Sequence, residues 1–169
     1  MCIRDRGSSS QEELQGSAMP GSFLTRMSEF QARLGSKRLT TLHARVRRRR
    51  AIAERYSAWL ATHGRTAAHE PDTSRHAFLR YPLRVRERDA FLEEAARRGL
   101  DLGDWFHSPL YPISGDLSAW GYRWGANPVA ERIASEIVNL PTDVGPEGRE
   151  LRAVEELLEA SVDRIVRGV

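Results

Sequence analysis

The chain has 169 residues, of which 40% are hydrophobic and 29% are charged, and its net charge at pH 7 is +3. This composition is typical of a soluble protein with one domain, or with one small domain and an extended arm. The apolar runs are only a few residues long, which excludes a membrane span, and we expect a cytoplasmic protein. The single cysteine, Cys2, excludes a disulfide framework and a cysteine-based metal site.

The basic residues are almost all arginine. Of the 26 basic residues only Lys37 is a lysine. A guanidinium group stays protonated and cannot act as an amine nucleophile, so any Schiff base formed within this chain would have to use Lys37. A lysine of that kind needs a buried site that lowers its pKa. Because Lys37 follows Ser36 in a helical pattern of surface-type residues, we expect it to have no catalytic role.

The N-terminal third divides into two segments. Residues 1–22 have no periodicity and are rich in serine and glycine, so we interpret them as an artefactual or linker segment. Residues 23–64 are predicted to form a long interface or interdomain helix, because apolar residues recur every three or four positions from Arg26 to Thr62. Gly35 is expected to mark a kink or a close contact, and Gly64 the end of the helix.

A run of arginines lies inside this helix, at residues 45–50 with Val46 among them. One interpretation is a patch that binds nucleic acid or phosphate, as in a stand-alone binding module. The other is a solvated helix face with Val46 turned inward. The modest net charge and the lack of interleaved aromatic residues favour the second interpretation, so we expect no nucleic-acid partner.

Residues 65–169 are predicted to form a small α/β domain. Residues 76–85 alternate, with Leu79 and Tyr81 on the inward face and Phe78, Arg80 and Pro82 on the other. A proline in such a segment indicates an edge strand or a bulge. A short helix over 87–98 with Phe91, Leu92 and Ala95 inward is stopped by Gly99, and a second strand follows over 100–106.

After a loop over 107–126, Asn127 and Pro128 are typical of a helix start. Val129, Ile133 and Ile137 are then predicted to line one helix face. A third strand is expected over 138–141 and a last helix over 146–166, with its inward face formed by Leu151, Val154, Leu158, Val162 and Ile165. The expected fold is therefore an α/β (α+β) small domain in which helices cover a three-stranded sheet.

Candidate chemistry concentrates in the loop. His107 and Tyr111 either face a ligand or satisfy backbone groups, and loops on rigid scaffolds often carry binding residues. Ser108 beside His107 lacks the carboxylate and the glycine signature of a hydrolase. The histidines have no metal-ligand spacing, so we expect no metal site. For the aromatic residues of this region we expect core packing or a subunit interface rather than base stacking: Trp105, Trp120, Tyr122 and Trp124.

Four segments in order resemble the C-terminal part of the DegT/DnrJ/EryC1/StrS family of pyridoxal-phosphate-dependent sugar aminotransferases. The segment 26–35 resembles the family's Arg-Met-Ser/Thr helix, and 48–56 resembles its Arg-Arg-x-x-Ala-x-x-Tyr continuation. The segment 106–110 stands where the family has a Tyr-x-x-Pro-Leu loop. The last segment, from Trp120 through Glu131 to Leu140-Pro141, resembles the Gly-x-x-Pro-x-x-Glu…Leu-Pro ending.

The resemblance implies the small domain of a fold-type-I aminotransferase that works as a homodimer on a nucleotide-sugar-like substrate. It implies that Arg26 contacts the cofactor, pyridoxal 5′-phosphate, or phosphates of the substrate, and that Trp105, His107 and Tyr111 bind substrate. The aldimine lysine belongs to a large domain that is expected to be absent here, so this chain would hold no cofactor covalently, would have no catalytic residue, and would be inactive alone. Leu24 departs from the family's usual Asn, and Trp105 and Tyr111 from its usual histidines.

Overall fold

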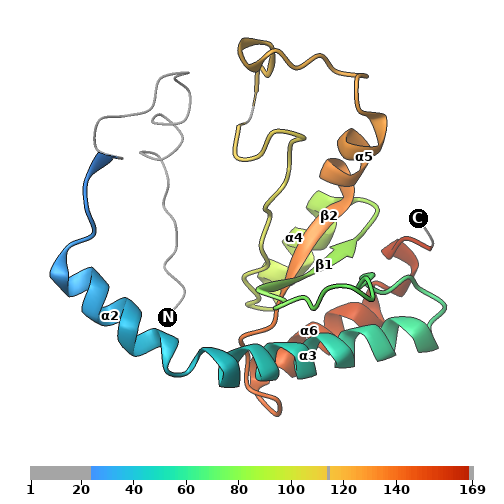
Figure 1. Cartoon of the computed structure of the whole chain (residues 1–169). Coiled ribbons are helices and arrows are strands. Elements are labelled where there is room, and N and C mark those ends of the chain that lie inside the picture. The colour runs from blue at the N-terminus through green and yellow to red at the C-terminus, as the bar shows by residue number, and fades with distance from the viewer. Residues whose placement is uncertain (1–23, 114, 168–169) are drawn as a thin grey trace.

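The computed structural model describes residues 24–113 and 115–167, a mixed arrangement of helices around one small sheet (Figure 1). The predicted linker segment 1–22 lies outside these residues. The helices and strands, in chain order, are α2 (Glu29–Leu39), α3 (Leu42–Thr62), β1 (Arg80–Arg84), α4 (Arg88–Arg97), η2 (Ser118–Trp120), α5 (Pro128–Glu136), β2 (Ile137–Pro141), α6 (Arg149–Ala160) and η3 (Val162–Arg164).

The sheet of the described chain has two strands, and the prediction of three was wrong. β1 and β2 pair antiparallel, with Tyr81 opposite Leu140 and Pro82 opposite Asn139. The predicted strand over 100–106 is reduced to one bridge, in which Gly103 and Asn139 exchange backbone hydrogen bonds of 3.0 and 2.9 Å. A Cβ atom at Gly103 would lie 3.0 Å from the Asn139 Cβ, so the absence of a side chain there permits the close approach.

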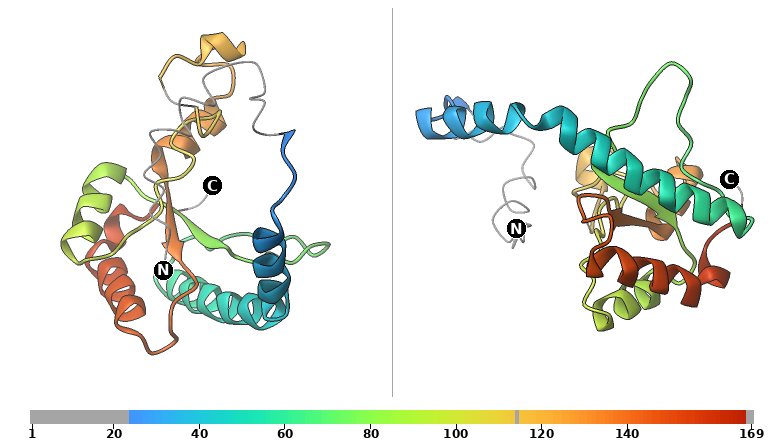
Figure 2. Two further views of the ribbon diagram at one scale, coloured as in Figure 1. Left: turned by 90° about the vertical axis from the view of Figure 1, so that its left-hand side faces the viewer. Right: turned by 90° about the horizontal axis from the view of Figure 1, so that it is seen from below.

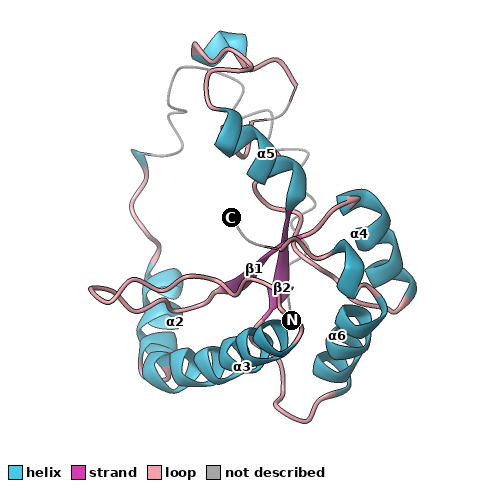
Figure 3. Cartoon of the chain, turned by 90° about the vertical axis from the view of Figure 1, so that its right-hand side faces the viewer, coloured by secondary structure: helices cyan, strands magenta, loops and turns pink. Residues whose placement is uncertain are grey.

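One face of the sheet is buried beneath helices. Tyr81 and Leu83 share this face with Leu140 and Val138, and all four are 3% exposed or less. All three helices cover this same face, with α3 toward one edge and α4 and α6 toward the other (Figures 2 and 3). The same core contains Ile52, Tyr56, Leu60, Phe91, Leu151, Val154, Leu157 and Leu158. The burial of these apolar side chains therefore determines which residues occupy the inner face of the sheet. The helices of this core do not cover the outer face, which carries Pro82 and Asn139.

The predicted long helix is two helices, and the break falls at Thr40 and Thr41 rather than at Gly35. The Thr40 hydroxyl donates to the Lys37 carbonyl (2.8 Å) and the Thr41 hydroxyl to the Arg38 carbonyl (3.2 Å), so side chains take the place of helix N–H donors. A Cβ atom at Gly35 would meet nothing within 4 Å, so that glycine makes no close contact. Gly64, at φ 61°, ends α3 as predicted.

Helix α2 begins with a capping box. Ser28 Oγ accepts from the Gln31 N–H (3.3 Å), and the Ser28 N–H donates to Gln31 Oε1 (2.8 Å). No residue of α2 is buried in this chain, and the helix extends away from the sheet (Figure 1).

The alternation predicted for 76–85 holds only from Arg80 onward. Phe78 has φ 45°, which interrupts the extended backbone, and Leu79 is turned outward with 59% of its surface exposed. Pro82 does lie in an edge strand, because β1 pairs along its length only with β2 among the described residues. The expected inward position of Leu79 was therefore wrong, and the edge position of Pro82 is confirmed.

The remaining helices are mostly shorter than predicted. α4 buries Phe91 and Ala95 as expected. In α5, Val129 is 56% exposed, so the predicted apolar face does not reach the start of the helix. α6 ends at Ala160, and η3 then lets Ile165 bridge to Val85. None of the helices in the described part of the chain is both long and apolar enough to cross a membrane.

The arginine run of α3 binds carboxylates rather than solvent alone. Asp143 accepts hydrogen bonds from Arg45 (2.9 Å) and Arg48 (2.8 Å), and Arg49 lies 3.5 Å from the same carboxylate. The Arg45 and Arg48 hydrogen bonds lower the pKa of Asp143 from 3.8 to about 2. These ion pairs fasten α3 to the loop after β2. The interpretation of a solvated helix face therefore holds for Arg47 and Arg48, which are exposed, and was wrong for Arg45 and Arg49, which are partly buried.

We predict that Asp143→Asn lowers the free energy of unfolding at pH 7 by about 1 kcal/mol, a modest value because the carboxylate is 36% exposed. The folded-state pKa lies below the unfolded one, so the stabilisation is present above pH 4 and is lost as the pH falls toward about 2. Urea unfolding of both proteins at pH 7 and pH 3 measures this difference. The exposed Asp101→Asn is the control, and an equal effect of the two variants at pH 7 would contradict the prediction.

Candidate functional site

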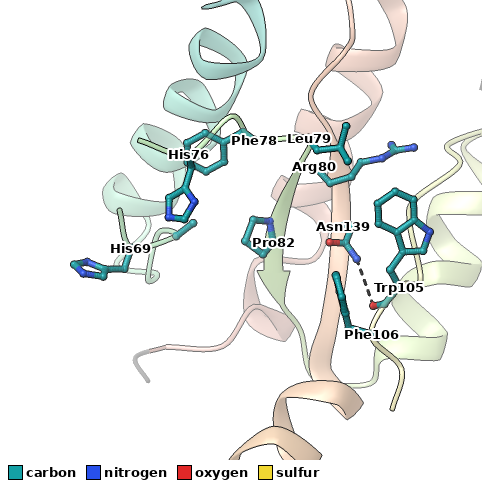
Figure 4. Close-up of a pocket in the computed structure, with 10 residues that line it drawn as sticks. His69, His76, Phe78, Leu79, Arg80, Pro82, Trp105, Phe106 and Asn139 are labelled. Carbon is teal, nitrogen blue, oxygen red and sulfur yellow. Dashed lines mark hydrogen bonds between the residues drawn. The ribbon is translucent and has the colours of Figure 1, made fainter. Parts of the chain in front are cut away.

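A cleft of about 600 Å³ opens on the outer face of the sheet. Pro82 of β1 and Asn139 of β2 are opposite one another in the register and form its floor. Residues that precede β1 line one side, and residues that follow the Gly103 bridge line the other (Figure 4). The full lining comprises Ala68, His69, His76, Phe78, Leu79, Arg80, Pro82, Trp105, Phe106 and Asn139.

The first wall is held by an ion pair with α3. Arg50 donates to both oxygens of Glu70, at 2.7 and 3.1 Å, and also to the His76 carbonyl at 2.7 Å. Glu70 in turn accepts from the His76 N–H at 2.6 Å. The hydrogen bond from Arg50 is the main reason that the pKa of Glu70 falls to about 2. The carboxylate therefore stays charged and, from its place beside His69, binds the His76 N–H at the far end of the same loop.

The second wall is built from Trp105 and Phe106. The Asn139 side-chain amide donates to the Gly103 and Trp105 carbonyls, each at 3.4 Å, and so fixes the backbone that carries these rings. The Arg80 guanidinium lies 5.7 Å from the centre of the Trp105 ring, within cation–π distance. Phe106 has φ 66°, a left-handed backbone conformation that is uncommon for a bulky residue. Its side chain is 52% exposed.

The predicted substrate residues do not all meet at this cleft. Trp105 lines it, whereas His107 borders a separate hollow formed with the start of α4 and the end of α5. Tyr111 packs against neighbouring rings, 5.2 Å from His107 and 5.3 Å from Phe106 between ring centres. Phe106 thus joins the cleft to the His107–Tyr111 pair.

Ser108 has a structural role in this loop. Its buried hydroxyl donates to the Ile113 carbonyl and accepts from the Leu110 N–H at 3.2 Å. The Tyr111 N–H donates to the Ser108 carbonyl at 3.2 Å. Because the hydroxyl closes this turn, it is not oriented by His107 as a nucleophile.

Arg26 and Lys37 both lie away from the cleft. Arg26 is exposed on the segment before α2 and forms no ion pair with the described residues. Lys37 is exposed in the last turn of α2, where a positive charge complements the helix dipole. Across the described residues no three His, Cys, Asp or Glu side chains are grouped so that they could hold a metal ion.

The remaining aromatic residues form a protruding arm rather than core. Trp120 and Trp124 are 41% and 62% exposed, so of the two expected roles core packing was wrong for them, and a place in a subunit interface stays a prediction. The arm is organised by Glu131, which accepts from the Tyr122 hydroxyl and the Gly125 N–H, each at 2.7 Å. The hydrogen bond from Tyr122 lowers the pKa of Glu131, and burial raises that of Tyr122. Glu131 therefore does more than complement the dipole of α5.

Sequence reasoning missed most of the cleft, although one signal pointed to it. The alternation placed Phe78, Arg80 and Pro82 on the outward face of their strand, and all three line the cleft. The two histidines of the cleft, His69 and His76, have no metal-ligand spacing, and nothing else in the sequence points to them. Asn139 gave no signal, because its role depends on the bridge to Gly103.

Comparison with known proteins matched residues 1–159 to the model of the DegT/DnrJ/EryC1/StrS aminotransferase family. The chain is also 35% identical over 123 residues to a dTDP-3-amino-3,4,6-trideoxy-alpha-D-glucose transaminase from Micromonospora megalomicea subsp. nigra. This alignment covers 69% of the chain and 32% of that transaminase, so the matched region spans about a third of the relative's length. No solved structure showed significant similarity.

We predict that Glu70→Ala loosens the first wall of the cleft, because it removes the acceptor shared by Arg50 and the His76 N–H. The measurement is amide hydrogen exchange, in which the His76 N–H should exchange several-fold faster than in the unchanged protein. Glu93→Ala, at an exposed position of α4, is the control. Unchanged exchange at His76 would show that the loop is held by something other than this carboxylate.

Proposed function

Because the chain belongs to the DegT/DnrJ/EryC1/StrS aminotransferase family, we propose that it is the C-terminal part of an enzyme that transfers an amino group to a keto sugar. The observation that carries this proposal is the match of the family model to residues 1–159. The sugar is proposed to be nucleotide-linked, as the name of the related transaminase specifies for that protein. The alternative of a stand-alone nucleic-acid-binding helix loses its support, since the arginines at 45, 48, 49 and 50 bind carboxylates.

The cofactor of such an enzyme would be pyridoxal 5′-phosphate, which acts as an electron sink and carries the amino group. The described residues do not fit covalent attachment of this cofactor. Lys37 is the one lysine of the sequence, and it is exposed on α2 rather than buried in a site that lowers its pKa. We therefore assign the attachment to the rest of the complete enzyme.

The proposed contribution of this chain is recognition. The exposed guanidinium of Arg26 can donate two parallel hydrogen bonds to a phosphate, of the cofactor or of the nucleotide sugar, across a homodimer interface. The loop at 105–111 is proposed to face the substrate through Trp105, His107 and Tyr111. The exposed apolar residues of α2 and its flanks are consistent with burial in the complete dimer: Leu24, Met27, Phe30, Leu34 and Leu39.

The absence of a role for Lys37 can be tested with the chain alone. We expect that the purified 169-residue chain mixed with pyridoxal 5′-phosphate shows no Schiff-base absorbance that depends on Lys37. The spectra of the unchanged chain and of Lys37→Ala should coincide. A band lost specifically in Lys37→Ala would contradict the assignment of the cofactor lysine to the rest of the enzyme.

The transferase activity is tested in the complete enzyme that contains this chain. With an amino donor and a nucleotide-linked keto sugar, we expect formation of the amino sugar, detected by mass spectrometry. Arg26→Gln should lower kcat/KM about tenfold or more, because a charged phosphate contact is lost. Arg38→Gln, in the last turn of α2, is the matched control. Equal losses in both variants would argue against a specific role of Arg26.

A further inference from the structure

The cleft on the outer face of the sheet has no role in the proposed phosphate contact of Arg26. It is concave, about 600 Å³ in volume, and lies in the size range of small-molecule sites. Its floor and walls come from four separate segments of the chain, and both walls are fixed by the hydrogen bonds described above. The cleft is therefore a built feature rather than a gap between loose loops.

The charge of the cleft has one sign. Arg80 contributes a permanent positive charge, and the imidazole groups of His69 and His76 on the opposite wall can donate hydrogen bonds to an anion. None of the residues that line the cleft is Asp or Glu. The nearby Glu70 is engaged by Arg50 and by the His76 N–H. An anionic ligand is therefore favoured over a cationic one.

Three aromatic rings dominate the apolar part of the cleft, which also includes Ala68, Leu79 and Pro82. Trp105 and Phe106 form one wall, Phe78 lies on the other, and the Pro82 ring lies between them (Figure 4). Aromatic rings such as those of Trp105 and Phe106 stack on a nucleobase, and a neighbouring guanidinium strengthens the stack. A free sugar fits less well, because its hydroxyl donors would find no carboxylate acceptors among the lining residues.

We propose that this cleft binds the nucleotide end of the substrate, with the base against Trp105 and Phe106 and the phosphates near Arg80. The inference rests on the proposed function, which supplies a nucleotide-linked sugar, and it deepens that function by naming the part of the chain that recognises the nucleotide. Asn139 then acts as a positioning residue, because its amide holds the Trp105 carbonyl.

Binding is tested with thymidine 5′-diphosphate as the probe and the ¹⁵N-labelled 169-residue chain. The chain has four tryptophans and therefore four indole N–H signals. The probe should shift the signal that is missing in Trp105→Phe and leave the signal missing in Trp124→Phe in place. The variants serve only to assign the indole signals, and the binding itself is measured on the unchanged chain.

Calorimetry with variants separates the two ends of the ligand. Trp105→Ala should weaken binding of the diphosphate about tenfold or more, as expected for the loss of one base-stacking ring. Trp124→Ala, on the exposed arm, is the control and should bind as the unchanged chain does. Arg80→Gln should weaken binding of thymidine 5′-diphosphate by a larger factor than binding of thymidine, because it removes the phosphate contact as well as the guanidinium beside the Trp105 ring.

Several outcomes overturn the assignment. They are a shift confined to the Trp120 or Trp124 signals, no binding, or inorganic pyrophosphate binding as tightly as the nucleotide. In the complete enzyme Trp105→Ala should raise KM for the nucleotide-linked sugar. An unchanged KM with normal transamination would overturn the nucleotide-binding role of the cleft and leave the proposed function standing. Nucleotide binding without aminotransfer to any nucleotide-linked keto sugar would instead overturn the proposed function and leave the cleft assigned.

Discussion

The structure depends on the attachment of α3 across one side of a two-stranded sheet. A sheet this small cannot bury enough apolar surface by itself, so it requires helices on its inner face. Apolar contacts from Ile52, Tyr56 and Leu60 supply the burial, and ion pairs at the ends of neighbouring loops fix the position of the helix. Arg45 and Arg48 bind Asp143 beyond β2, and Arg50 binds Glu70 before β1. The helix therefore connects the loops that flank both strands, and through Glu70 it also shapes a wall of the cleft.

The cleft follows from what the sheet lacks. A complete third strand beside β2 would continue the ladder past Gly103, but pairing stops at a single bridge. The chain beyond the bridge is free to leave the plane of the sheet, and the amide of Asn139 holds it there through the Trp105 carbonyl. On the other edge, the left-handed conformation of Phe78 turns the chain just before β1. Two interruptions of regular structure thus raise walls on either side of Pro82 and Asn139.

The sequence predicted the elements better than their connections. Period-2 and period-3.6 patterns located β1 and the cores of α3, α4 and α6, because burial on one face constrains residue type directly. β2 is buried along its whole length and has no such alternation, although a short strand over 138–141 was predicted there. The break at Thr40 and Thr41 was missed because it depends on side-chain hydroxyls that compete for helix carbonyls, whereas Gly35 has only a low helix propensity. Of the three residues predicted to bind substrate, Trp105 lines the cleft in the structure. His107 borders another hollow, and Tyr111 packs against its neighbours. Arg80, His76 and Asn139 were not singled out, because residues distant in sequence make the cleft only after folding.

The arginines of this chain fall into two groups, those paired with carboxylates of the fold and those left open to a ligand. A guanidinium remains charged when partly covered and can bind two acceptors at once, which a lysine ammonium does with less geometric definition. Arg50 uses this property to bind both Glu70 oxygens and the His76 carbonyl. Arg26 and Arg80 differ, since neither is paired with a carboxylate among the described residues, and each is placed where an anion can approach. Arginine therefore has two uses in the described chain. It joins α3 to the loops beside the sheet, and at Arg26 and Arg80 it leaves a guanidinium open to an anion, whereas the one lysine, Lys37, is exposed on α2 and unsuited to amine chemistry.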